Sequence, residues 1–132
     1  MEPVVEMRFQ TNEVSIKNNY LPDGNYTVNP TFNRKTGFVD KDTAFTELSV
    51  EIINTKEHPF PVDIRVSITG FFKNICIPPQ QEEEFLKLSA VQILFPYLRS
   101  IISTVTTSSM YPPIILPIID VNTLFPEDQN KK

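Results

Sequence analysis

The chain has 132 residues, 40% of them hydrophobic, and a formal net charge of −4, which predicts a single folded domain over residues 1–132. The lack of a basic stripe disfavours nucleic-acid binding, and Cys76, as the only cysteine, excludes an intrachain disulfide. Because no apolar run approaches the ~20 residues of a membrane-spanning helix and the N-terminus does not resemble a signal peptide, we expect a soluble, cytoplasmic protein with no membrane insertion.

The first predicted element is a half-buried strand near the N-terminus. Apolar and polar residues alternate from Val5 to Phe9. Val14 and Ile16 then fall on the opposite parity, so the alternation changes phase before them. A bulge near Thr11-Asn12 would return both sets to one face of a single strand, whereas the alternative is two separate strands.

The second predicted strand follows the turn Pro22-Asp23-Gly24-Asn25 and is rich in aromatic residues. Tyr26, Phe32 and Phe38 share one parity. Pro30 cannot donate a ladder hydrogen bond, so this strand lies at an edge of the sheet or is broken. Its aromatic side chains either join the core or form a docking surface, because an exposed edge strand with aromatics needs a partner to cover it.

The next two predicted strands form an antiparallel hairpin. Residues from Leu48 to Ile52 and from Val62 to Phe72 alternate between apolar and polar side chains, and residues 54–59 form the turn between them. For the remaining strands we expect a meander, in which each strand pairs with its neighbour in sequence.

A long helix is predicted from Glu82 to Thr107. It carries two apolar stripes with helical spacing, one made of Leu88, Val91, Phe95, Leu98, Ile102 and Val105, and the other of Ala90, Leu94, Tyr97 and Ile101. A helix this apolar cannot have most of its surface in water, so we expect one side to lie on the sheet and the other to face another chain or a ligand. Pro96 removes one backbone hydrogen bond, which predicts a kink near Gln92.

The chain beyond this helix is apolar and rich in proline. Residues 114–119 are too apolar for a solvated loop, and Pro117 interrupts them too strongly for a sheet strand. Asp120 or Asn122 could cap a short final helix that contains Leu124 and Phe125.

The residue types that carry enzyme chemistry form no recognisable constellation. His58 is the only histidine, and no second histidine or cysteine cluster can complete a metal site. The three glycines are scattered, so there is no glycine-rich phosphate loop. The sequence therefore predicts a protein that is not an enzyme, uses no cofactor or metal ion, and works by exposing and burying apolar surface.

Residues 93–99, ILFPYLR, resemble the ILFPYAR signature of the SecB export-chaperone family, with Leu98 in place of the alanine. Further segments resemble the family on both sides of this signature: Glu13–Ile16 and Gly70–Phe72 upstream, and Met110–Pro112, Leu116-Pro117 and Asp120–Phe125 downstream. The resemblance covers nearly the whole chain and is most specific from Ile93 to Phe125.

The resemblance implies an α+β fold: a four-stranded antiparallel sheet with one long helix and a short C-terminal helix. Members of the family assemble as dimers of dimers, partly through the long helices. The matching interface of a homotetramer here would be formed by Leu94, Tyr97, Ile101 and Phe72.

Members of the SecB family hold unfolded or precursor polypeptides in apolar grooves and pass them to the SecA motor during protein export. The matching groove surface would consist of Phe32, Tyr111, Ile114, Leu116, Ile118, Leu124 and Phe125. Glu13 fits the acidic pattern through which the family contacts SecA, whereas Lys17 and Arg65 stand where the family tends to have carboxylates. Pro126 also shortens the final helix relative to the family.

Three hypotheses about function follow from the sequence. In the first, the protein is an ATP-independent chaperone for unfolded or precursor polypeptides. The second keeps the same fold but dedicates it to one client, such as the antitoxin of a toxin–antitoxin system. The third is a small-ligand carrier with a pocket between the helix and the sheet.

Overall fold

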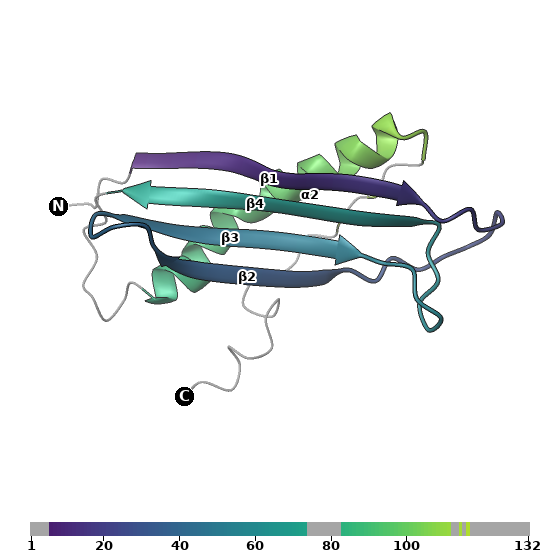
Figure 1. Ribbon diagram of the computed structural model, residues 1–132, viewed down its shortest axis with the longest axis horizontal. Helices are drawn as coiled ribbons and strands as arrows, with labels where there is room; N and C mark the ends of the chain where they lie inside the picture. Colours follow the sequence, from purple (N-terminus) through teal and green to yellow (C-terminus); the bar gives the residue numbers. More distant parts are fainter. Residues whose placement is uncertain (1–5, 74–82, 112–113, 115, 117–132) are drawn as a thin grey trace.

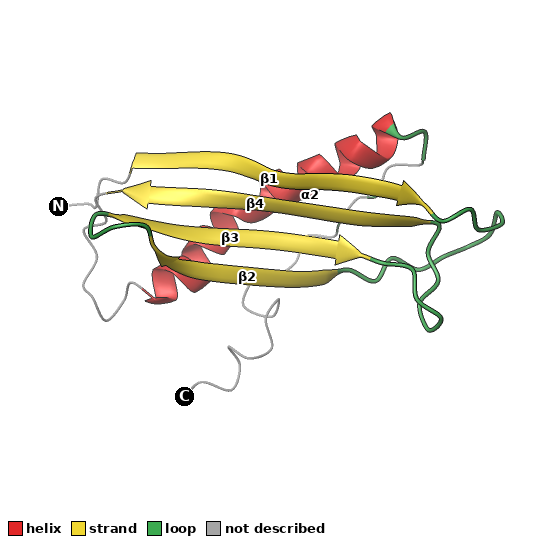
Figure 2. Ribbon diagram, viewed as in Figure 1, coloured by secondary structure: helices red, strands yellow, loops and turns green. Residues whose placement is uncertain are grey.

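The computed structural model describes residues 6–73, 83–111, 114 and 116. Its elements, in chain order, are β1 (Glu6–Asn18), β2 (Thr31–Phe38), β3 (Thr43–Ile52), β4 (Val62–Lys73), the π-helical turn η1 (Phe85–Ser89) and α2 (Ala90–Ser108). The four strands form one antiparallel sheet in the order β1-β4-β3-β2, and α2 crosses one face of it diagonally (Figures 1 and 2). This arrangement confirms the predicted sheet and long helix, while the predicted short final helix lies outside the described residues.

β1 is a single strand with a bulge at the predicted place. Its pairing with β4 shifts by one residue between Thr11 and Glu13. The extra residue, Asn12, donates a side-chain hydrogen bond of 2.6 Å to Thr69 Oγ1 on β4. The shift returns Val14 and Ile16 to the helix-facing side of the sheet, which decides between the two alternatives left open by the sequence.

The lateral position of β1 differs from the predicted meander. The hairpins β2–β3 and β3–β4 pair neighbours in sequence, but β1 pairs with β4 and not with β2. Residues 19–30, with two prolines among them, are too long for a tight hairpin and carry the chain across to the opposite edge. β1 and β2 are therefore the two edges of the sheet.

The core lies between the sheet and α2. Leu48, Ile64, Leu94, Leu98 and Ile102 are among its fully buried members. The stretch Phe85–Ser108, with a mean hydropathy of 1.3, is long and apolar enough for a membrane helix, although we expected no such stretch. This is weak evidence for a membrane span, because a helix that packs on a sheet, as α2 does, passes the same test.

Gly70 on β4 lies at a tight contact between the sheet and the helix. A Cβ atom added to this glycine would lie 3.1 Å from the Leu94 Cδ2 atom of α2 and 3.1 Å from the ring of Phe72. A larger residue here would push the helix outward, so the glycine sets the distance between the two layers.

The helix begins with an irregular turn that the sequence did not predict. The predicted irregularity was a kink near Gln92, caused by Pro96, whereas the π-helical turn η1 ends before that position. Two carbonyl groups of η1 accept side-chain hydrogen bonds from the sheet: Leu86 O from Thr46 Oγ1 and Lys87 O from an Arg34 amino group, each at 2.8 Å. The sheet thus satisfies backbone groups at the start of the helix.

Candidate functional site

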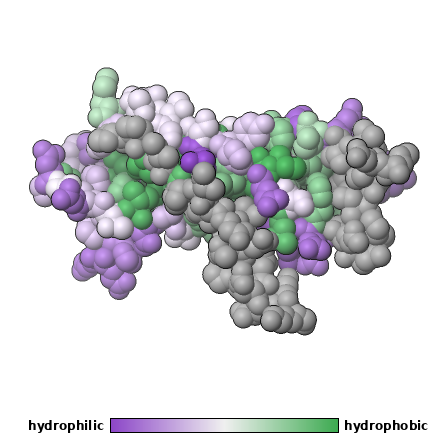
Figure 3. Space-filling model, turned by 180° about the vertical axis from the view of Figure 1, so that it is seen from behind, coloured by the Kyte–Doolittle hydropathy of each residue, from purple (hydrophilic) through white to green (hydrophobic). Residues whose placement is uncertain are grey.

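The described part of the chain contains no group of three or more histidine, cysteine or acidic residues placed to hold a metal ion. His58 is exposed in the β3–β4 loop, where its backbone N–H donates to Thr55 Oγ1. Cys76 lies outside the described residues. Exposed apolar surface is therefore the candidate site. Figure 3 shows such surface on the helix-bearing face, interrupted by polar residues.

The first apolar surface lies between β1 and α2, and we call it the β1-flank patch: Met7, Phe9, Val14, Tyr97 and Ile101. Met7 and Tyr97 are 51% and 53% exposed, and the rings of Phe9 and Tyr97 pack with centroids 5.2 Å apart. A shallow cavity of about 220 Å³ opens between them, with Leu94 and Ile68 among its lining residues. This patch is continuous across a strand and a helix, so it is larger than a scatter of single exposed residues.

The four residues predicted to form an oligomer interface occupy two different depths. Tyr97 is exposed and Ile101 is half-buried, so both can contact another chain. Leu94 is fully buried but still lines the cavity of the patch. Phe72 is also fully buried and packs edge-to-face against Phe85 with ring centroids 5.4 Å apart, so it supports the surface from below.

A second set of apolar residues consists of Phe32 on β2 and two residues that follow α2, and we call it the β2-flank patch: Phe32, Tyr111 and Ile114. All three are half-buried and pack against the main core cluster, and the Phe32 ring lies 5.9 Å from that of Phe95. Leu116 is only 1% exposed and belongs to the core itself. The other three residues of the predicted groove, Ile118, Leu124 and Phe125, lie outside the described residues.

The chain reverses direction at the end of α2 through a Schellman turn. The N–H of Tyr111 donates to Thr106 O at 3.0 Å, and the N–H of Met110 donates to Thr107 O at 3.1 Å. Met110 occupies the left-handed position of this motif with a φ of 68°. The turn directs the following residues back along the helix, which is how Tyr111 and Ile114 reach the main core cluster.

The opposite face of the sheet is polar, with acidic and basic residues interleaved. Glu51 pairs with Arg65 at 3.7 Å. The carboxylate of Asp63 accepts hydrogen bonds from the Asn54 backbone and the Asn19 side chain. The backbone bond from Asn54 is the main cause of the lowered pKa of Asp63, opposed by burial and assisted by Asn19. Much of the negative charge on this face is thus engaged within the sheet.

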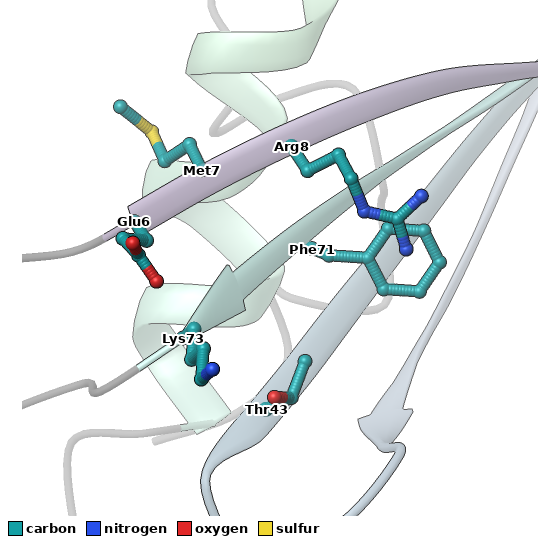
Figure 4. Close-up of a pocket in the computed structure, with 6 residues that line it drawn as sticks. All are labelled: Glu6, Met7, Arg8, Thr43, Phe71 and Lys73. Atoms are coloured by element: carbon teal, nitrogen blue, oxygen red, sulfur yellow. The ribbon is translucent and has the colours of Figure 1, made fainter.

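A cleft of about 520 Å³ opens on this outer face, where β1 begins and β4 ends (Figure 4). Its lining residues are Glu6, Met7, Arg8, Thr43, Phe71 and Lys73. The guanidinium carbon of Arg8 lies 4.4 Å from the centroid of the Phe71 ring, which fixes a cation over an aromatic face. Glu13, the residue that fits the acidic SecA pattern, is exposed further along β1 and pairs with Ser67.

Comparison with known families identifies the fold. The model of the SecB family, described as preprotein translocase subunit SecB, matches residues 2–132. The chain belongs to the SecB family. The protein-export protein SecB of Neisseria meningitidis serogroup B is 27% identical over 128 residues, which cover 97% of this chain and 72% of that protein.

Two other relatives match over a shorter region. An uncharacterized protein of Methanocaldococcus jannaschii is 43% identical over 61 residues, 46% of this chain and 39% of that protein. The SecB of Ehrlichia ruminantium is 40% identical over 58 residues, 44% of this chain and 33% of its own length. The matches to these two relatives thus span well under half of their length.

A solved structure shows the same fold as this SecB-family chain. The Mycobacterium tuberculosis SecB-like chaperone Rv1957, in complex with a ChAD peptide from the HigA1 antitoxin, superposes with a TM-score of 0.73 at 14% identity. The superposition covers 87% of this chain and 90% of that one. At this level of identity the likeness supports the fold and leaves the client open.

Proposed function

We propose that this SecB-family chain is an ATP-independent chaperone that holds unfolded or precursor polypeptides in apolar grooves. The observation that carries the proposal is apolar surface on both flanks of α2, largely exposed at the β1-flank patch and half-buried at the β2-flank patch. Burial of apolar side chains requires no particular partner geometry, so such surface suits clients of varied sequence. SecB-family chaperones are non-enzymatic, in agreement with the lack of catalytic motifs in the sequence.

We assign the β1-flank patch to self-association, as a dimer of dimers. Tyr97 and Ile101 would contact the partner chain, with Leu94 and Phe72 supporting them from the core. Within the described part of the chain, no strand pairs with the outer edge of β1, so a second copy of the strand can pair there. Exposed edge strands with apolar residues, such as Met7 and Phe9, require a cover of this kind.

We assign the β2-flank patch to the client. Phe32, Tyr111 and Ile114 offer half-buried aromatic and aliphatic side chains, and Leu116 anchors the same segment in the core. Ile118, Leu124 and Phe125 extend this surface in the proposal, as the family resemblance implies. No strand of the described residues pairs with the outer edge of β2, so this edge can add strand-like hydrogen bonds to an extended client.

A role in protein export would place the protein in the cytoplasm and require a contact with SecA, for which Glu13 is the candidate residue. The outer face of the sheet favours a chaperone that serves one client without SecA. Lys17 and Arg65 lie beside the acidic residues there, and Glu51 is paired with Arg65. A chaperone dedicated to one client, such as an antitoxin, is therefore the second candidate. The mycobacterial SecB-like chaperone in complex with an antitoxin peptide has the same fold, which supports this second candidate.

The small-ligand carrier is the third candidate. Three clefts among the described residues, of about 520, 470 and 220 Å³, are open to solvent. An enclosed apolar pocket between α2 and the sheet would be needed for a carrier. The buried side chains of Leu94, Leu98 and Ile102 fill that space in the described part of the molecule.

Light scattering of a chemically denatured model protein, diluted into buffer without nucleotide, tests the chaperone proposal. We expect the wild type to suppress aggregation, and Phe32→Ser to weaken this protection. Phe38→Ser is the matched control: Phe38 lies at the other end of the same strand, is 52% exposed, and should leave protection unchanged. Unchanged aggregation with the wild type at several-fold molar excess would exclude the proposal.

A pull-down from the native host separates a general chaperone from a dedicated one. Many unrelated polypeptides, together with SecA, would support the role in export. One abundant partner, without SecA, would support the dedicated role.

A further inference from the structure

The segment that follows α2 is held by hydrogen bonds to its backbone from side chains of the helix. Ile114 N–H donates to Thr106 Oγ1 at 2.9 Å, and Ile114 O accepts from Ser103 Oγ at 3.1 Å. Leu116 O accepts from Arg99 Nε at 2.8 Å. Later residues of the segment thus contact earlier residues of the helix, so the two run antiparallel.

The spacing of these contacts matches the geometry of the two chains. Residues 99 and 103 lie one helical turn apart, a rise of about 6 Å. Residues 114 and 116 of an extended chain lie about 6.6 Å apart. Polar side chains four residues apart on a helix can therefore bind an extended backbone every second residue. We call Arg99, Ser103 and Thr106 the backbone clamp.

Among the clamp residues, a substitution at Thr106 best separates a role in positioning the segment from a role in packing the core. It is fully buried, and its hydroxyl donates within the helix to Ile102 O at 2.9 Å while accepting from Ile114 N–H. An apolar residue of the same shape would fill this space equally well. The hydroxyl is needed only if the backbone of Ile114 must lie at this place.

We propose that Arg99, Ser103 and Thr106 are positioning residues of the client site. They fix the backbone of Ile114 and Leu116 before a client arrives, so that binding does not have to order this wall of the groove. This inference rests on the proposed function, because it takes the β2-flank patch as the surface that receives a polypeptide.

The clamp also determines how a client meets the two walls of the site. The N–H and C=O of Ile114 are both engaged by the helix, so this wall offers its side chains. At β2, no strand of the described residues pairs with the outer edge. In the proposal, a client pairs its backbone with this edge and buries its side chains against Tyr111 and Ile114.

The clamp lies on the opposite side of α2 from the β1-flank patch. Thr106 and Tyr97 are nine residues apart, which at ~100° per residue is about two and a half turns, so their side chains leave the helix on opposite sides. Substitution of Thr106 should therefore leave self-association unchanged and affect the client site alone.

The test compares Thr106→Val with a matched control, Thr107→Val. The control removes a hydroxyl that bonds only within the helix, to Ser103 O at 2.8 Å. Amide hydrogen exchange at Ile114 reports the clamp, and the Kd for a fluorescently labelled, reduced and alkylated model polypeptide reports client binding. Native mass and exchange in β3 and β4 report assembly and fold.

We expect Thr106→Val to speed exchange at Ile114 and to raise the client Kd, each on the order of tenfold, as for loss of a buried hydrogen bond. Thr107→Val should change neither the exchange rate at Ile114 nor the client Kd. Thr106→Ser keeps the hydroxyl, so both quantities should stay at their wild-type values. Exchange in β3 and β4 and the native mass should be unaffected.

Two results would overturn the inference. Unchanged exchange at Ile114 in Thr106→Val would show that the clamp does not hold the segment. Faster exchange with an unchanged client Kd would show that client binding does not depend on positioning. Failure of the proposed function looks different, since the wild type itself would then bind no polypeptide.

Discussion

At the scale of single residues, Asp63 joins the ends of three strands. Its Oδ1 atom accepts hydrogen bonds from Asn54 N–H at 2.8 Å and from the Asn19 side chain at 2.9 Å. These segments follow β3 and β1, while Asp63 itself lies at the start of β4. One carboxylate thus connects the strands at the end of the sheet opposite the cleft that Arg8 and Phe71 line.

The protonation of Asp63 predicts how stability depends on pH. Its folded-state pKa is lowered from the ordinary value of 3.8, chiefly by the Asn54 N–H. A group with a depressed folded pKa stabilises the fold above its unfolded pKa, and this contribution is lost as the pH falls through the folded value. Asp63→Asn should lower the free energy of unfolding at pH 7 by about 1 kcal/mol and flatten its decline below about pH 4.

Urea unfolding of the two proteins between pH 7 and pH 2.5 measures this difference. Equal pH profiles for wild type and variant would show that Asp63 makes no pH-dependent contribution.

Met110 is a residue with a backbone conformation that its side chain disfavours. Its φ of 68° is left-handed, and its side chain is 94% exposed, so it gains little from packing. Met110→Gly should raise the free energy of unfolding by about 1 kcal/mol, because glycine adopts this conformation without a Cβ clash. Thermal unfolding measures the change, with Met110→Ala as the control that retains the strain. Equal melting temperatures for Met110→Gly and the control would contradict this account.

The clamp residues are the part of the site that the sequence did not predict. Arg99, Ser103 and Thr106 have the spacing of a polar helix face, and such a face is usually solvated. Nothing in the local pattern indicates that residues 111–116 fold back onto it. Tyr111 and Ile114 entered the predicted site only through the family resemblance, whereas the edge-strand pattern around Phe32 already allowed a docking surface there.

At the scale of elements, local periodicity predicted most of the sheet. The bulge in β1, the β3–β4 hairpin and the edge position of β2 followed from alternation and from Pro30. The pairing of β1 with β4 did not, because strands far apart in sequence carry no local mark of their partner. The turn η1 was also missed, since its carbonyls are satisfied by Thr46 and Arg34 from other elements.

The contact between α2 and β4 at Gly70 gives a prediction about this packing. Gly70→Ala places a methyl group 3.1 Å from Leu94 Cδ2 and the Phe72 ring, so the helix must shift. We expect a loss of about 1–3 kcal/mol in the free energy of unfolding, as for other overpacked cores. Gly24→Ala is the control, because its added methyl would lie no closer than 3.7 Å to Tyr26. A difference of less than about 0.5 kcal/mol between the two variants in urea unfolding would refute tight packing at Gly70.

At the scale of the whole molecule, one chain leaves apolar surface on both flanks of α2. The β1-flank patch and the β2-flank patch lie on different sides of the same helix, which allows self-association and client binding to occur together. The sequence indicated this surplus through the two apolar stripes of the helix. It did not indicate how deeply each apolar residue is buried, and two residues of the predicted oligomer interface, Leu94 and Phe72, are fully buried.

Self-association through the β1-flank patch predicts the effect of a charge placed there. Tyr97→Asp should raise the dissociation constant of the assembly about a hundredfold, because an unpaired charge would be buried at the interface. Gln92→Asp is the control: Gln92 is exposed on another face of α2 and should leave assembly unchanged. Sedimentation velocity at several concentrations measures the difference. Equal assembly of both variants would exclude this patch as the interface.

Native mass spectrometry with and without an unfolded model polypeptide measures self-association and client binding in one experiment. We expect an assembly of four chains in the absence of client, and the same assembly with added polypeptide mass in its presence, without nucleotide. A single chain that retains the mass of one 15.2 kDa protomer and gains no polypeptide would contradict this expectation.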